Sequence, residues 1–379
     1  MDSSRRLAYG AFGVAALVAV GAVVGNIVLD TRDSGSTPRT INGLPATTVA
    51  ANSSSCVSLP SGIDSGPRAF SVTNTSIEPV SVTLTGPNGT AYAEVESLAP
   101  RTTRTMQADL GGGTYEFRCY FGAAPEITSA TFTVRGAAAA GPAVTPVSTQ
   151  DLTPPTLQYE NWVGSQLPVL AADARALAAA GTIDDQRRAW LTAHHRYETL
   201  GAAYGAFGDW DAKISGDGFD AIEASLWSAS PTIPAGEETK LVADVDGLSA
   251  DFPNLAIDPL DIGLRAHEIT ENTIEFTLSG RDDHGAHASL DTASANLAGT
   301  QEVLNVLRPL LAPRYAEMAS TDAELGRAQQ LVADLAVKYP GRPLSDLDQG
   351  DREGLNSAFG GLVELLAPIA AITDVRRTR

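Results

Sequence analysis

The character of the chain changes once along its length, from short strand-like runs to long helical repeats. Over residues 53–135, runs of β-branched and aromatic residues are broken at short intervals by Gly, Pro and Asn. Over residues 157–379, apolar residues instead recur at spacings of three and four. Residues 136–156 are rich in Ala, Gly, Pro and Thr without periodicity, which is typical of an interdomain linker. The sequence therefore predicts a β domain followed by an all-α helical bundle.

The first of these domains is predicted to be a small β-sandwich. Turn-forming residues at 86–89 and at 111–113 separate segments that read as antiparallel strands. The predicted strands are residues 68–73, 80–85, 91–98, 103–108, 114–120 and 128–134.

An uncharged segment near the N-terminus is long enough to cross a membrane. It begins at Leu7 and ends at Leu29, and two arginines precede it. Such a run spans the hydrocarbon layer, and positive charge before it favours a cytoplasmic N-terminus. We interpret residues 7–29 as an uncleaved transmembrane anchor, with a cleaved signal peptide as the alternative. Both interpretations place the rest of the chain outside the cytoplasm, after a flexible tether over residues 30–52.

The two cysteines, Cys56 and Cys119, both fall within the predicted sandwich. In an oxidising compartment such a pair is expected to form a disulfide bond. A copper site of the cupredoxin type is the alternative, and it needs two imidazoles beside a thiolate. No histidine precedes His194, so the sandwich cannot complete such a site and we expect no copper.

The charge balance argues against nucleic acid as a partner. The chain carries 45 acidic and 26 basic residues, for a net charge of −19. This excess attracts cations in general, although it is equally consistent with a role in solubility. All five histidines lie at or after His194, in the helical part of the chain. This uneven placement draws attention to the second domain.

Helices are predicted across this second domain, and a capping box at Thr321 and Glu324 marks the start of one of them. The predicted helices are residues 184–207, 219–227, 264–278, 289–311, 323–338 and 352–369.

Several carboxylates and imidazoles share faces of these helices. Helix bundles build metal sites from such inward-projecting side chains, and hard oxygen ligands with some nitrogen favour Fe, Mn or Zn. At each position the alternative is an ordinary ion pair on a solvated face. The loop 282–287, with two carboxylates and two imidazoles, is either cation-binding or simply solvated. The candidate metal ligands are Asp220, Glu223, Glu198, His267, Glu268 and Glu271.

Three segments of this domain carry a resemblance to a known family. They are GAAYGAFGD at 201–209, GFDAIEASLW at 218–227 and RAHEITENT at 265–273, followed by AGT at 298–300 and LRPL at 307–310. Their order and spacing resemble the actinobacterial branch of the EfeO/imelysin-like family, and the preceding sandwich resembles that family's cupredoxin-like domain. The resemblance implies an extracytoplasmic component of an EfeUOB-like iron-uptake system. Its implied partners are an iron permease of the FTR-like type and a haem-dependent peroxidase.

The same resemblance implies a metal site that departs from the family pattern. Members of the imelysin group were described as metallopeptidases with a His-x-x-Glu motif as metal ligands, and the matching residues here are Asp220 and Glu223. Replacing the histidine by aspartate favours a hard cation such as Fe(III) over peptidase chemistry. No His-Glu-x-x-His or Gly-x-Ser-x-Gly motif is present. We therefore expect an iron-binding protein and no enzyme, with a scaffold that has lost metal affinity and a metal-dependent peptidase as the alternatives.

Overall fold

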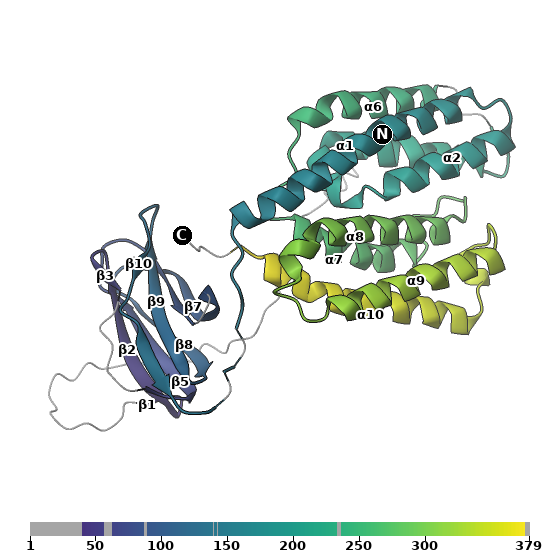
Figure 1. Cartoon of the computed structure of the whole chain (residues 1–379). Helices are drawn as coiled ribbons and strands as arrows, with labels where there is room; N and C mark the ends of the chain where they lie inside the picture. Colours follow the sequence, from purple (N-terminus) through teal and green to yellow (C-terminus); the bar gives the residue numbers. More distant parts are fainter. Residues whose placement is uncertain are drawn as a thin grey trace, which may run out of the picture. The chain divides into compact units, whose positions relative to one another are not determined.

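The computed structural model of the chain describes residues 40–56, 63–86, 89–138, 140–141, 143–232 and 236–375. The anchor predicted at residues 7–29 lies outside the described residues. One hydrophobic core is formed by strands and a separate one by helices (Figure 1). The predicted order, a β domain followed by an all-α domain, is confirmed.

The described strands of the β domain form two sheets. The first has the order β1 (Thr40–Ile41), β2 (Leu44–Asn52), β5 (Gly66–Asn74), β8 (Thr103–Leu110), with β3 (Ser55–Cys56) pairing with β2. The second has the order β4 (Ile63–Asp64), β11 (Phe132–Arg135), β9 (Gly113–Phe121), β6 (Val80–Thr85), β7 (Ala91–Leu98), with β10 (Ile127–Thr128) pairing with β9. The pairs β2 with β5 and β4 with β11 are parallel, whereas the remaining neighbours are antiparallel.

The two sheets enclose a common core and are linked covalently. Phe70 of the first sheet meets Phe117 of the second edge to face, with ring centroids 5.4 Å apart. Cys56 on β3 and Cys119 on β9 form a disulfide bond, so the bridge joins one sheet to the other.

The predicted flexible tether is wrong over residues 40–52, which form β1 and β2. On β2 the side chains of Thr47, Val49 and Ala51 are buried in alternation, while β2 pairs in parallel with β5. The alternation has the period of two that a half-buried strand requires. Because two of the three inward residues are small or polar, a search for apolar residues does not detect this pattern.

The helical domain packs around a single core. Helix α1 contacts α2 and α6, α8 contacts α1, α2, α7 and α9, and α10 contacts α7 and α9 (Figure 1). The α-helices are α1 (Thr149–Ala179), α2 (Ile183–Glu198), α3 (Tyr204–Phe207), α4 (Asp209–Ile214), α5 (Ala221–Leu226), α6 (Glu237–Asp251), α7 (Ile262–Asn272), α8 (Ser289–Leu311), α9 (Met318–Lys338) and α10 (Gln349–Thr373). Segments η2 (Gly201–Ala203), η4 (Phe252–Asn254) and η6 (Leu344–Asp346) are 3₁₀-helical, and η3 (Ser215–Asp220) and η5 (Thr273–Thr277) are π-helical.

The predicted helices do not include α1, α4 or α6, and the other corrections concern element boundaries. The predicted linker at 136–156 overlaps α1, because Ser148 and Asp151 form a capping box that starts this helix ahead of its prolines. The helix predicted over 184–207 ends at Glu198. The capping box predicted at Thr321 is wrong, because α9 has already begun and the Thr321 hydroxyl donates to the carbonyl of Glu317.

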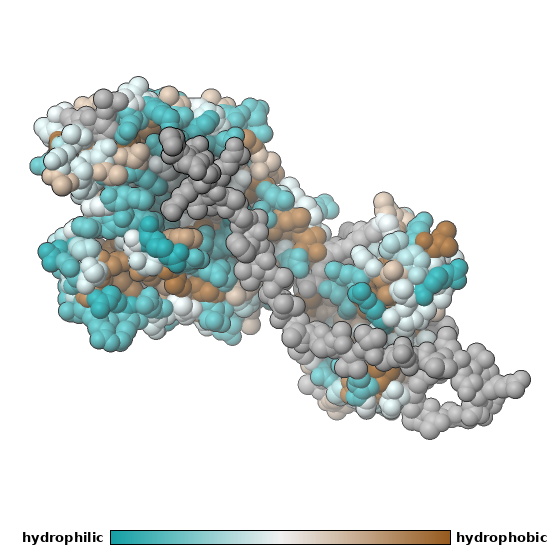
Figure 2. All heavy atoms as spheres, turned by 180° about the vertical axis from the view of Figure 1, so that it is seen from behind, coloured by the Kyte–Doolittle hydropathy of each residue, from teal (hydrophilic) through white to brown (hydrophobic). Residues whose placement is uncertain are grey.

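Among the described residues, α10 alone is long and apolar enough to span a membrane by length and composition. Core helices of soluble domains pass the same test, and α10 places Phe359, Leu362 and Leu366 in the core of the helical domain. The face of this domain seen in Figure 2 is largely hydrophilic, with scattered hydrophobic patches. Packing in the core is therefore a sufficient explanation for the apolar character of α10.

Candidate functional site

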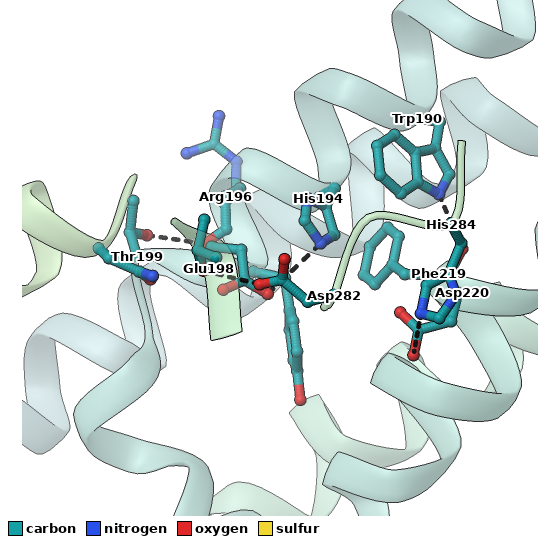
Figure 3. Close-up of polar contacts among 12 residues, drawn as sticks. Trp190, His194, Arg196, Glu198, Thr199, Phe219, Asp220, Asp282 and His284 are labelled. Atoms are coloured by element: carbon teal, nitrogen blue, oxygen red, sulfur yellow. Dashed lines mark hydrogen bonds and ion pairs between the residues drawn. The ribbon is translucent and has the colours of Figure 1, made fainter. Parts of the chain in front are cut away.

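Four carboxylates from separate elements of the helical domain lie near enough for their charges to interact. Glu198 is the last residue of α2, Asp211 lies on α4, Asp220 ends η3, and Asp282 lies in the loop after η5. The negative charges of Asp282, Asp220 and Asp211 each act on Glu198, and Figure 3 shows Glu198 beside Asp282. We call these four residues the acidic cluster.

Local departures from regular helix bring these side chains together. The π-helical segment η3 ends at Asp220. Thr277, the last residue of η5, donates a hydrogen bond to Asp282 at 2.7 Å. Turns of π-helix insert extra residues into a helix and are frequent at functional sites. At the end of α2, Gly299 of α8 permits close approach, because a Cβ there would lie 2.6 Å from the carbonyl oxygen of Thr199.

Glu198 forms the deep end of the acidic cluster, with a side chain 17% exposed. Burial, followed by the charges of Asp282, Asp220 and Asp211, raises its pKa to about 8. The neighbouring His194 imidazole, with Nε2 3.4 Å from Glu198 Oε1, does not compensate this charge. Burial lowers the pKa of His194 to about 4, so its ring, stacked on Trp190, is neutral at pH 7 (Figure 3).

Asp220 lies at the open end of the acidic cluster, where it pairs with His284. Asp220 Oδ2 lies 3.6 Å from His284 Nε2, and the two side chains are 37% and 41% exposed (Figure 3). Partial burial raises the pKa of Asp220 to about 6, with the charge of His284 opposing and those of Asp282 and Asp211 adding to the shift. An ion can therefore reach the acidic cluster from this end.

Two tyrosines, Tyr197 on α2 and Tyr204 on α3, lie beside the acidic cluster. Tyr197 donates a hydrogen bond to Asp211, and Tyr204 donates one to the backbone carbonyl of Tyr197 at 3.0 Å. Their rings stack with centroids 4.9 Å apart. Burial raises the pKa of both hydroxyls well above the ordinary value, so they remain protonated donors.

Glu223, predicted as a ligand beside Asp220, is buried on α5. Its Oε1 accepts backbone hydrogen bonds from His284 and Ala286, at 2.9 and 2.8 Å. Burial raises the pKa of Glu223 to about 8, although these two bonds lower it.

The other predicted ligands lie on α7 and make local pairs. His267 Nδ1 is 3.6 Å from Glu271 Oε2, and Glu268 accepts a hydrogen bond from Arg265 at 2.7 Å. In the part of the chain that the structure describes, no hydrogen bond or ion pair joins them to the acidic cluster.

The acidic cluster gathers negative charge without a basic partner of equal strength. Among the described residues, neither Lys nor Arg makes an ion pair with it. Nor do any three His, Cys, Asp or Glu side chains of the described residues lie close enough to hold a metal ion as placed. Like charges that crowd together and are partly withdrawn from water are stabilised by protons or by a cation. Carboxylate oxygens favour a hard cation.

Asp211, Asp282 and His284 were absent from the predicted ligand set. Asp282 and His284 lie in the loop 282–287, which the sequence left open between cation binding and solvation. The separation of Asp211 from Glu198 along the chain carries no helical spacing that would indicate the contact.

Metal-free protein is expected to lose roughly 3 kcal/mol of stability between pH 6.5 and pH 8. Across this window the folded state holds protons on Glu198 and Glu223, whose pKa of about 8 exceeds the ordinary 4.5. The unfolded state binds fewer protons, so the free energy of unfolding falls as pH rises. His195, whose pKa a hydrogen bond with Asp291 raises, acts in the same direction. His194, whose pKa burial lowers, opposes the change by only roughly 0.4 kcal/mol, because its unfolded-state imidazole is already half neutral at pH 6.5.

Urea unfolding of metal-free protein at pH 6.5 and pH 8 measures this change. Stability that rises with pH across the window would contradict the protonation assigned to the two glutamates.

Comparison with known proteins shows what this chain is similar to. No family model matches it. "Iron uptake system component EfeO" of Escherichia coli K12 is 24% identical over 298 residues, which is 74% of this chain and 78% of the relative. The same-named proteins of Shigella flexneri and Escherichia coli O157:H7 match to the same extent. The chain is EfeO-like. The aligned length exceeds that of the helical domain alone, so the EfeO likeness also extends beyond the helices.

Proposed function

We propose that this EfeO-like chain is the iron-binding component of an iron-uptake system, capturing iron at the acidic cluster and delivering it to a permease. The observation that carries the proposal is the convergence of Glu198, Asp211, Asp220 and Asp282 without a Lys or Arg partner among the described residues. We propose iron as the metal because the EfeO relatives are named as components of an iron uptake system.

The donor set suits iron as a cargo. Carboxylates are hard ligands and the accessible imidazole of His284 is a borderline one, a set that suits Fe(III) or Fe(II) better than Cu(I). Asp220 and His284 are partly exposed, so they would meet the ion first, and Glu198 would bind it at the deep end. The exchange of protons for a cation would leave a site from which iron can be released as well as captured. Roles for His267, Glu268 and Glu271 remain predictions from the sequence.

The proposed setting is the outer side of the cell membrane. The disulfide between Cys56 and Cys119 supports an oxidising compartment. The anchor at residues 7–29 would keep the domains near the membrane, and the permease and a haem-dependent peroxidase are the partners that the family resemblance implies. We propose no peptidase activity, because Asp220 replaces the histidine of the family's metal motif.

A scaffold without metal affinity is the second candidate. It is favoured by the absence, among the described residues, of three ligand side chains already close enough to hold an ion.

Calorimetric titration of the full chain with Fe(II), Fe(III)-citrate and Zn(II) separates these candidates. The wild type is expected to bind iron saturably, and Asp220→Asn to bind it at least about tenfold more weakly. Asp322→Asn is the matched control, since Asp322 pairs with Arg308 outside the acidic cluster. A wild type that binds no metal would contradict the proposal and favour the scaffold.

A further inference from the structure

The carboxylate of Glu223 is hydrogen-bonded to the backbone of a loop that is distant in the sequence. Its Oε1 oxygen accepts hydrogen bonds from the backbone N–H groups of both His284 and Ala286, which lie 61 and 63 residues further along the chain. A carboxylate oxygen offers about two lone-pair directions, and two hydrogen bonds use them. Glu223 is only 3% exposed. The oxygen that faces the loop is therefore not available to a cation.

The loop that Glu223 holds carries two members of the proposed iron site. Asp282 precedes the bonded segment and acts on Glu198 through its charge. His284 lies within the bonded segment and pairs with Asp220. The position of this short stretch of backbone thus decides whether Asp282 and His284 can reach an ion bound by Glu198 and Asp220.

The loop conformation depends on support from carboxylates. Gly285 has φ +129°, and His287 has φ +56°, a left-handed value that few non-glycine residues adopt. Asp283 accepts hydrogen bonds from the N–H groups of Gly285 and His287, at 2.9 and 3.0 Å. Glu223 accepts those of the alternate residues, His284 and Ala286. Two carboxylates, Asp283 within the loop and Glu223 on α5, therefore accept hydrogen bonds from four consecutive backbone N–H groups.

We propose that Glu223 is a positioning residue, which through Oε1 holds the loop 282–287 so that Asp282 and His284 face Glu198 and Asp220, and is not itself an iron ligand. The part of this inference that concerns iron rests on the proposed function. The part that concerns the loop does not.

Amide hydrogen exchange of the full chain without metal, resolved at residues 284 and 286, tests the loop directly. Glu223→Ala is expected to accelerate exchange at both amides by at least about tenfold, because their acceptor is lost. Glu223→Gln keeps a carbonyl acceptor at the same place and is expected to retain most of the protection. Glu198→Gln is the matched control, since it removes a carboxyl of the acidic cluster without touching either amide.

Iron titration of the same variants separates positioning from ligation. Glu223→Gln is expected to bind iron within about threefold of the wild type, and Glu223→Ala at least about tenfold more weakly. If Glu223→Gln lost binding as fully as Glu198→Gln while its amides stayed protected, Glu223 would be a ligand and the inference would be overturned. Unchanged exchange in Glu223→Ala would overturn it as well. A wild type that bound no iron would refute the proposed function, and the exchange data alone would then decide the role in the loop.

Discussion

Glu198→Gln is expected to change iron affinity and stability in opposite directions. Without metal at pH 8, the variant should be more stable than the wild type by roughly 3 kcal/mol, because it removes a carboxylate that burial and neighbouring charges hold at a pKa of about 8. Iron affinity should fall by about 100-fold, since the deepest oxygen ligand is lost. Urea unfolding without metal and calorimetry with Fe(II) measure the two effects.

The informative result is a gain in metal-free stability together with a loss of iron affinity. A residue that served packing alone would lose stability on substitution and leave affinity little changed. Glu324→Gln on α9 is a suitable control, because Glu324 is also a buried glutamate but pairs with Arg327 outside the acidic cluster. A loss of stability in metal-free Glu198→Gln would contradict the inference that the Glu198 carboxylate destabilises the folded protein when no metal is bound.

Removal of the disulfide should destabilise the β domain by about 4 kcal/mol. The bridge between Cys56 and Cys119 closes a loop of 63 residues, and a loop of this length loses that much unfolded-state entropy in the chain-entropy account. The double variant Cys56→Ala/Cys119→Ala leaves small apolar residues at two buried positions. Its β domain should unfold at a lower urea concentration, as followed by far-UV circular dichroism.

The helical domain provides the internal control for this measurement. All four tryptophans of the chain lie between Trp162 and Trp227, in the helical domain. Tryptophan fluorescence therefore follows this domain alone, and its midpoint should stay unchanged because the two cores are separate. An unaltered β transition in the variant, or free thiols in unreduced wild type, would count against a structural role for the bridge.

The sequence was informative where structure depends on local pattern. The change from strand-like to helical periodicity separated the two domains, because period and residue type decide which element a segment can form. It failed where tertiary contacts replace an apolar pattern. Strand β2 buries Thr47 and Ala51 beside Val49, and α1 carries prolines at 154, 155 and 168 that usually interrupt helices.

The acidic cluster, likewise, could be predicted from the sequence only in part. Glu198 and Asp220 were predicted because each has a partner at helical spacing. Asp211 and Asp282 could not be placed beside them from spacing, since the contacts depend on π-helical segments and on a loop held by Glu223. Conversely, His267 and Glu271 show ideal helical spacing and form a pair that the described contacts confine to α7.

The most direct test of the central claim, that the acidic cluster binds iron, is anomalous diffraction at the iron absorption edge from crystals of the iron-loaded protein. We expect a peak within bonding distance of the carboxylates of Glu198 and Asp220, with Asp282 or His284 beside it. A peak elsewhere in the molecule, or none from protein shown to be saturated with iron, would contradict it.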